Sequence, residues 1–202
     1  MDKALVIIAS GNKDKVREIQ QIFRDRHFEV KRAMDVGPVL DVVEDGTTFA
    51  ENAYLKAKAY HDLYPDAYIL ADDSGLEVDP LDGRPGIYSA RYGGVDWSYE
   101  DKSKLLWEEL RKTGLEPEDW TARFRCAICF WEKDKEEPKT FEGAMEGLVI
   151  PERRGENGFG YDPLFFLPQY GKTSAEISPD LKNKISHRAN ALAKLETYLN
   201  TL

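Results

Sequence analysis

The fold is decided around residues 68–76, whose sequence is Tyr68-Ile69-Leu70-Ala71-Asp72-Asp73-Ser74-Gly75-Leu76. The apolar residues that open this stretch predict the end of a buried strand. Gly75 permits a sharp turn that most residues could not make. We therefore expect a strand that delivers the carboxylates of Asp72 and Asp73 to the mouth of a loop, where ligands of α/β proteins bind.

Asp72 and Asp73 place two carboxylates side by side in the chain. Such groups repel each other unless a cation or a proton relieves them. Magnesium would relieve them, because it prefers oxygen ligands and bridges carboxylates to substrate phosphates. The alternative is an ordinary polar turn after a strand, since Asp, Ser and Gly are common turn formers.

Length and charge limit the class of protein. A chain of 202 residues predicts a single domain over residues 1–202, in one body or two closely joined lobes, with a real core. The net charge of −9 argues against a general nucleic-acid or acidic-membrane binder, but a small phosphorylated ligand in a local basic pocket remains compatible. The apolar run Leu5–Ala9 is too short for a signal peptide, so a cytoplasmic location is expected.

Cys126 and Cys129 have CxxC spacing within the segment 124–131, which is typical of a strand. Residues three apart in a strand point to opposite faces, whereas a redox or zinc pair needs a turn or a helix start. We therefore interpret both as structural thiols.

The N-terminal segment predicts a strand, a loop and a helix. Residues 3–9 form a β-branched apolar run, Ser10-Gly11-Asn12 breaks it, and apolar residues then recur at helical spacing. Backbone N–H groups at such a helix start favour anions, and Lys13 and Lys15 add positive charge there. The alternative is a plain strand–helix turn with solvated lysines.

Glu44 precedes a second predicted helix. Thr48 and Glu51 have the spacing of a capping box, so the helix is expected to begin at Thr48. Glu44 before this helix and Asp73 after the strand would reach one metal ion if the two elements pack side by side.

The second half of the chain adds a predicted β-hairpin, Thr121–Trp131 with Thr140–Val149, and a glycine-rich loop at residues 155–163. In that loop, Phe159 and Tyr161 offer faces on which a base could stack; the alternative is a flexible loop whose aromatics pack on the core.

Near the C-terminus, Ser178-Pro179 starts a helix. At about 100° per residue, one straight helix cannot point Lys182, His187 and Arg188 into one pocket. If Ser186 caps a second helix, His187 and Arg188 lie at its first turn, beside free N–H donors. The alternative for His187 is a surface or capping histidine.

Several of these motifs together resemble the inosine/xanthosine triphosphate pyrophosphatase family, the non-canonical purine NTP pyrophosphatases or XTP/dITP diphosphatases. The matching segments follow in order along nearly the whole chain: Ser10–Lys15, Ala71–Leu76, Pro85–Gly93, Gly158–Pro163 and Ser186–Arg188. The resemblance implies an α/β fold with an elongated mixed central sheet flanked by helices, and two lobes with the nucleotide cleft between them. It also implies a magnesium-dependent homodimer that hydrolyses ITP, dITP and XTP to the monophosphate and pyrophosphate.

The resemblance also assigns roles to residues. It implies that Glu44 and Asp73 hold magnesium, and that Asp73 is the base for the attacking water. The residues implied to bind substrate are Ser10, Gly11, Asn12, Lys13, Asp14, Lys15, Ser74, Phe159, Gly160, Tyr161, Asp162, Lys182, His187 and Arg188. Ser10 stands where the family often has threonine, a change that keeps the hydroxyl.

The base would be selected by its 6-oxo group, which accepts a hydrogen bond where adenine presents an amino donor. Donors from His187, Arg188 or a backbone N–H would pair with it, and rejection of guanine needs a further contact at the 2-position. Two rival functions are a Maf-like nucleotide pyrophosphatase acting on pyrimidine or modified nucleotides, and a nucleotide sensor without catalysis.

Overall fold

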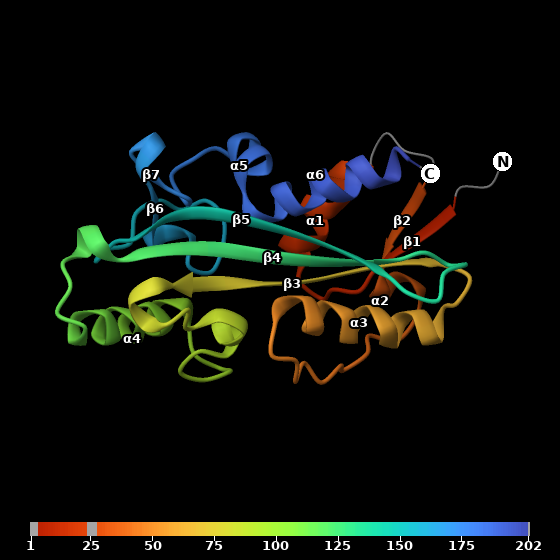
Figure 1. Ribbon diagram of the computed structural model, residues 1–202, viewed down its shortest axis with the longest axis horizontal. Coiled ribbons are helices and arrows are strands. Elements are labelled where there is room, and N and C mark those ends of the chain that lie inside the picture. Colours follow the sequence, from red (N-terminus) through yellow and green to blue (C-terminus); the bar gives the residue numbers. More distant parts are fainter. Residues whose placement is uncertain (1–3, 24–27, 202) are drawn as a thin grey trace. The chain divides into compact units, whose positions relative to one another are not determined.

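The computed structural model describes residues 4–23 and 28–201, and the side chains of residues 14, 21 and 22 also lie outside the description. Contacts divide the chain into two compact units. Unit 1 comprises Met1–Asp73, Cys126–Gly143 and Arg188–Leu202, and unit 2 comprises Ser74–Arg125 and Ala144–His187. Each unit is an α/β structure, as the sequence predicts (Figure 1).

Among the described residues, seven strands hydrogen-bond in the order β2-β1-β3-β4-β5-β6-β7. Their bounds are β1 Ala4–Ile8, β2 Phe28–Arg32, β3 Tyr68–Val78, β4 Thr121–Trp131, β5 Lys139–Val149, β6 Phe165–Leu167 and β7 Lys172–Thr173. β1 is parallel to β2 and β3, whereas β6 is antiparallel to β5 and β7, so the sheet is mixed as expected. The strand predicted from Lys3 is confirmed from Ala4, and Lys3 itself lies outside the described residues.

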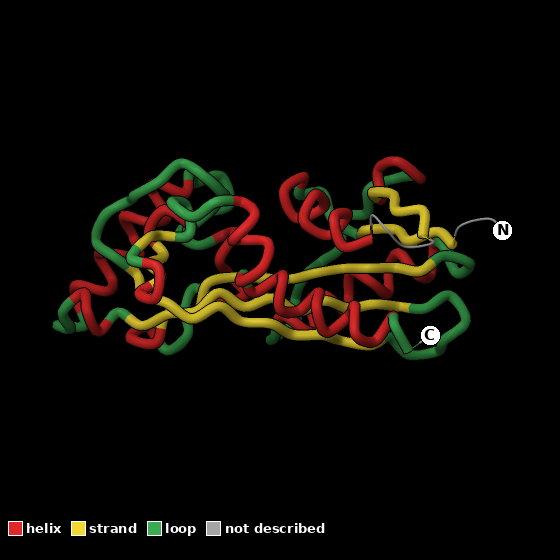
Figure 2. Tube along the Cα trace, turned by 90° about the horizontal axis from the view of Figure 1, so that it is seen from above, coloured by secondary structure: helices red, strands yellow, loops and turns green. Residues whose placement is uncertain are grey.

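Three strands, β3, β4 and β5, each have 11 residues, and each has residues in both units. Strands are drawn in yellow in Figure 2. β4 and β5 are neighbours in the sheet and are joined by residues 132–138, which confirms the predicted hairpin.

In unit 1, helices cover both faces of the sheet. The helices of one face are α1 (Lys13–Phe23) and α6 (His187–Leu199), and those of the other are α2 (Ala33–Val36) and α3 (Phe49–Leu63). The strands alternate accordingly: Ile8 packs with the first pair of helices and Ile7 with the second. Cys126 and Cys129 divide between the same two faces and are buried free thiols, which confirms their structural role.

Unit 2 has one hydrophobic core, which includes Leu76 of β3, Phe124 of β4 and Leu106 of α4 (Tyr99–Lys112). Helix α4 begins at the cap Ser98, whose hydroxyl accepts a hydrogen bond from Asp101 N at 3.1 Å, and ends before Gly114, which has a positive φ of 74°. The short helix α5 (Pro179–Ile185) lies at the edge of this core.

The expectation that the strand ends before the aspartates is wrong. β3 continues through Asp72, Asp73, Ser74 and Gly75 to Val78, so no turn forms at Gly75. A strand tolerates two adjacent aspartates because successive side chains point to opposite faces, which separates the two charges across the sheet. The aspartates therefore lie in the interior of a strand and not at the mouth of a loop.

No helix among the described residues combines the length and the apolar character that crossing a membrane requires.

Candidate active site

The loop between β1 and α1 is held in shape by its own side chains. Asn12 N donates to Ser10 Oγ at 3.2 Å, and Asn12 Oδ1 in turn accepts from Lys15 N at 3.2 Å, which caps the helix. A Cβ added at Gly11 would meet nothing within 4 Å, so the backbone of this loop borders open space. Exposed N–H groups at the start of an amphipathic helix suit an anion.

Asp72 points to the α1 and α6 face of β3 and is fully buried. Its Oδ2 atom lies 3.0 Å from Lys15 Nζ and 3.3 Å from Arg188 Nη2. Burial alone would raise the pKa of Asp72, but the charges of Lys15 and Arg188 outweigh it and hold the pKa well below its usual range. Asp72 is therefore a permanent anion that fixes two cations.

Arg188 is 1% exposed and bonds a second carboxylate, that of Glu18 on α1. The predicted break at Ser186 explains its position: α5 ends at Ile185, and α6 begins at His187. Arg188 thus lies in the first turn of α6, as the sequence predicts, and its guanidinium joins α1, α6 and β3 in an internal ion-pair network.

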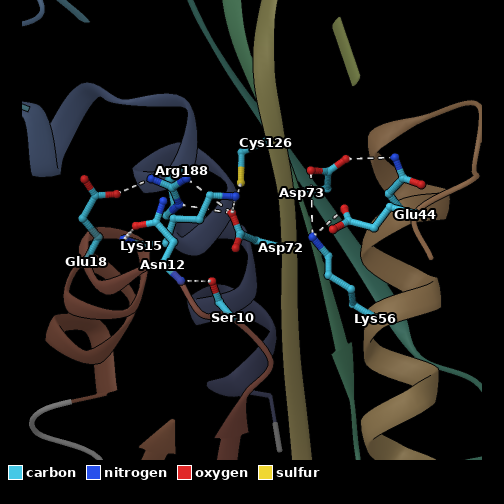
Figure 3. A network of polar contacts seen from close by, with 11 residues as sticks. Ser10, Asn12, Lys15, Glu18, Glu44, Lys56, Asp72, Asp73, Cys126 and Arg188 are labelled. Carbon is cyan, nitrogen blue, oxygen red and sulfur yellow. Dashed lines mark hydrogen bonds and ion pairs between the residues drawn. The ribbon is translucent and has the colours of Figure 1, made fainter. Parts of the chain in front are cut away.

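Asp73 points to the opposite face of β3, toward α3 (Figure 3). Asn52 Nδ2 donates to Asp73 Oδ2 at 3.1 Å, and Lys56 Nζ lies 3.9 Å from Asp73 Oδ1. Lys56 Nζ is also 2.9 Å from Glu44 Oε2. The structure therefore brings Glu44 and Asp73 together around one ammonium group.

The surroundings of Asp73 favour its protonated form more than those of Asp72. Burial raises the pKa of Asp73, the nearby charge of Glu44 raises it further, and Lys56 and Lys15 only partly oppose this. A buried carboxylate with a raised pKa is suited to proton transfer.

The loop that carries Glu44 is anchored by α3. Thr48 caps the helix and accepts a hydrogen bond from Glu51 N at 3.1 Å, as predicted. Glu51, however, bonds Thr47 N at 2.6 Å, so it reaches one residue farther back than in a capping box. Asn52 Oδ1 accepts from Gly46 N at 2.9 Å, while its Nδ2 bonds Asp73. One buried amide thereby fixes both the Glu44 loop and Asp73.

Three residues of this cluster were not predicted: Asn52, Lys56 and Glu18. The sequence did carry a signal for the first two, because Asn52 and Lys56 are one helical turn apart and Asn52 interrupts the apolar stripe of α3. Glu18 lies one turn after Lys15 on α1, which is typical of an exposed charged face and gives no such signal.

The donor set is compatible with a divalent cation that also takes ligands from substrate. Glu44 and Asp73 already share one cationic group, the Lys56 ammonium. Among the described residues no group of three or more His, Cys, Asp or Glu side chains could hold a metal by itself. Magnesium commonly binds through one or two carboxylates and substrate phosphates, which fits a two-carboxylate site.

In unit 2, the glycine-rich loop is organised by Asp162. The buried Asp162 Oδ2 accepts hydrogen bonds from Phe159 N at 2.8 Å and from Lys182 Nζ at 2.6 Å. Lys182 Nζ also lies 5.0 Å from the centroid of the Phe159 ring. Gly158 and Gly160 have positive φ angles of 75° and 67°, which bulkier residues rarely adopt. The loop is thus pre-shaped, and the ring of Phe159 is held in place.

The other predicted residues of unit 2 are largely enclosed. Tyr161 is 3% exposed, packs edge-on against Tyr99, and donates from its hydroxyl to Ser89 O at 3.0 Å, so its ring faces the interior of the unit. The imidazole of His187 stacks on Phe124 at 5.0 Å between ring centroids. Ser74 is half-buried in β3. Phe159 is the partly exposed aromatic ring of the loop.

The predicted residues therefore divide between the two units. Unit 1 holds Ser10, Gly11, Asn12, Lys13, Lys15, Glu44, Asp73 and Arg188. Unit 2 holds Ser74, Phe159, Gly160, Tyr161, Asp162, Lys182 and His187. Lys13 is exposed at the start of α1, and the side chain of Asp14 lies outside the described part of the chain.

Comparison with known proteins agrees with the predicted resemblance. The model of the Ham1 family matches residues 6–198. A dITP/XTP pyrophosphatase of Listeria monocytogenes is 46% identical over 191 residues, which are 95% of this chain and 92% of that protein. A dITP/XTP pyrophosphatase of Bacillus subtilis is 46% identical over 193 residues, 96% of each chain.

Solved structures agree as well. The Ham1 protein of Staphylococcus aureus has a TM-score of 0.87 at 41% identity over 98% of each chain. A HAM1 protein of Coxiella burnetii has a TM-score of 0.91 at 36% identity, covering 98% of this chain and all of that one (100%). The chain belongs to the Ham1 family.

Proposed function

We propose that this chain hydrolyses the purine nucleoside triphosphates ITP, dITP and XTP to the monophosphate and pyrophosphate, and so removes deaminated purines from the nucleotide pool. The names of its relatives, dITP/XTP pyrophosphatases at 46% identity, support this activity. The observation that carries the proposal is the grouping of Glu44, Asp73 and Lys56 in unit 1, the unit that also holds the anion-suited loop Ser10–Asn12.

Water attack on a polyanion requires that the phosphate charge be neutralised and that the water lose a proton. Lys15, which Asp72 holds in place at 3.0 Å, and the exposed Lys13 supply positive charge beside the N–H groups of the loop. Glu44 and Asp73 would hold Mg²⁺, which supplies charge neutralisation at the phosphates when bound.

Asp73 is the proposed base. It accepts a proton from the attacking water as the bond between the α-phosphate and the departing pyrophosphate breaks. Its raised pKa brings it closer to the pH at which a carboxylate transfers protons efficiently. Asn52 keeps the carboxylate oriented by its hydrogen bond at 3.1 Å.

Base recognition is assigned mainly to residues of unit 2. Phe159 offers a stacking surface, which the ion pair of Lys182 and Asp162 holds in position. His187, Arg188 and backbone N–H groups are the proposed donors to the 6-oxo group of hypoxanthine or xanthine, which adenine could not satisfy. Because Arg188 bonds Asp72 and Glu18, its proposed contribution includes holding the start of α6.

The proposal extends to assembly and location: we infer a homodimer that acts on the cytoplasmic nucleotide pool. Light scattering at several protein concentrations tests the dimer, and a monomer at all of them would contradict it.

The activity is tested by pyrophosphate release from ITP, XTP, GTP, ATP and dTTP, each with and without magnesium. We expect fast magnesium-dependent release from ITP and XTP and little from ATP or GTP. Release mainly from dTTP would overturn the proposal in favour of a Maf-like enzyme. Tight nucleotide binding without release would indicate a sensor.

A further inference from the structure

Lys56 occupies the position between the two carboxylates to which the metal is assigned. Its Nζ atom is 2.9 Å from Glu44 Oε2 and 3.9 Å from Asp73 Oδ1, and its side chain is 15% exposed. The lysine comes from the middle of α3, one turn after Asn52, so the same helix that orients Asp73 also supplies its cation.

The ammonium of Lys56 is a stable charge at this place. A lysine side chain is ordinarily protonated at neutral pH. The ammonium of Lys56 therefore pairs with the carboxylates of Glu44 and Asp73, which a divalent cation would use.

A divalent cation and an ammonium cannot share these oxygens without cost. Both need the same carboxylate atoms, and two cations a few ångströms apart repel each other in a partly buried site. Lysine is a compact charge on a flexible four-carbon stem, so an incoming phosphate can draw it away while its Cα stays in place.

We propose that Lys56 is a resident counter-ion that competes with Mg²⁺ for Glu44 and Asp73, so that the nucleotide-free protein binds the metal weakly. The anionic phosphates of the nucleotide engage the Lys56 ammonium and thereby open the carboxylates to the metal. Metal and nucleotide consequently bind together. This inference rests on the metal site assigned under the proposed function.

The test measures metal affinity in the nucleotide-free full-length protein, with Mn²⁺ as the probe because its free form gives a strong electron paramagnetic resonance signal. We expect Lys56→Met to bind Mn²⁺ about tenfold more tightly than the unchanged protein. Lys56→Arg keeps the charge and should bind as weakly as the unchanged protein.

Lys58→Met is the matched control, because Lys58 lies on the same helix and pairs with Asp62 at 2.6 Å on the exposed surface. It removes one positive charge from α3 and should leave Mn²⁺ affinity unchanged. Circular dichroism verifies folding, and Lys56→Gln, which keeps a hydrogen-bond donor, replaces Lys56→Met if that variant does not fold.

The outcomes separate the competition from the metal site. One outcome is that Lys56→Met and the unchanged protein bind Mn²⁺ equally, with weaker binding when Glu44→Gln is added to either. That result would mean that Lys56 does not compete with the metal, although Glu44 still binds it. Absence of Mn²⁺ binding in Lys56→Met overturns both, while pyrophosphate release still tests the activity. Tighter binding in Lys58→Met as well would show a general charge effect and overturn the role of Lys56.

Discussion

The adjacent aspartates Asp72 and Asp73 lie on opposite faces of β3 and have different surroundings. On the α1 and α6 face, Asp72 is enclosed and its Oδ2 atom contacts Lys15 and Arg188 at 3.0 and 3.3 Å. On the α3 face, Asp73 has a neutral amide at 3.1 Å and a more distant ammonium at 3.9 Å that it shares with Glu44. The pKa is lowered for Asp72 and raised for Asp73.

Because of this difference, one of two adjacent residues has a structural role and the other a chemical role. A carboxylate that is bound to two cations has little tendency to accept a proton, so Asp72 suits a positioning role. A buried carboxylate whose charge is only partly compensated accepts a proton more readily and is suited to bind a metal. One strand thus supplies an anchor on one face and a reactive group on the other.

The largest expected effect is on turnover. Asp73→Asn removes the proposed base and metal ligand while keeping a side chain of the same size, so kcat should fall about a thousandfold. The measurement is pyrophosphate release from ITP at saturating magnesium. Circular dichroism should show an unchanged fold. Full activity in this variant would contradict the chemical role that distinguishes Asp73 from Asp72.

The next effect is on stability. Asp72→Asn removes the carboxylate that pairs with both the buried Arg188 and Lys15. Breaking a buried ion pair from one side costs several kcal/mol, so we expect the free energy of unfolding in urea to drop by about 3 kcal/mol. Asp73→Asn is the matched control and should lose much less; equal losses would mean that the two faces do not differ.

A smaller effect is expected on metal dependence. Glu44→Gln removes one proposed ligand and keeps the side chain's shape, so about tenfold more magnesium should be needed for half-maximal rate. The check is a magnesium titration of pyrophosphate release from ITP. An unchanged titration curve would remove Glu44 from the metal site.

The smallest effect is on the pH dependence of stability, where the two aspartates should have opposite signs. The lowered pKa of Asp72 contributes stability above the ordinary value of 3.8, and this contribution is lost as the pH falls from that value to the lowered pKa of the folded state. The raised pKa of Asp73 means that the folded state binds its proton more tightly, so stability is gained as the pH falls from that raised value toward 3.8.

Urea unfolding from pH 7 to pH 4 measures the contribution of Asp73. Asp73→Asn removes the gain, so its stability relative to the unchanged protein should decline on acidification. If the relative stability of Asp73→Asn stayed constant over this range, Asp73 would not have a raised pKa.

Local patterns predicted most elements of the fold, because strands, caps and turns follow from a few neighbouring residues. The cap at Thr48, the break at Ser186 and the hairpin of β4 and β5 are examples. The length of β3 was mispredicted, because Asp-Asp-Ser-Gly is typical of a turn, whereas here it lies within a sheet and Asp72 and Asp73 have partners on other elements. Those partners are distant in sequence.

The site was predicted unevenly for the same reason. Glu44 and Asp73 were expected to meet, and both contact Lys56. Lys56 and Asn52 themselves were missed, since a lysine on a helix is usually a solvated residue. The roles of Lys182 and Asp162 as an ion pair that holds Phe159 also depend on contacts that spacing does not indicate.

The burial of the two thiols of β4 has a practical consequence. Burial raises the pKa of both Cys126 and Cys129 to about 12, so at pH 8 almost none of either sulfur is thiolate and alkylating reagents find no nucleophile. Labelling then requires that the strand open. Cys126 faces the α1 and α6 side of the sheet, whereas Cys129 faces the α3 side. The labelling rate of each sulfur therefore reports how fast one face of the sheet opens, separately from the other face.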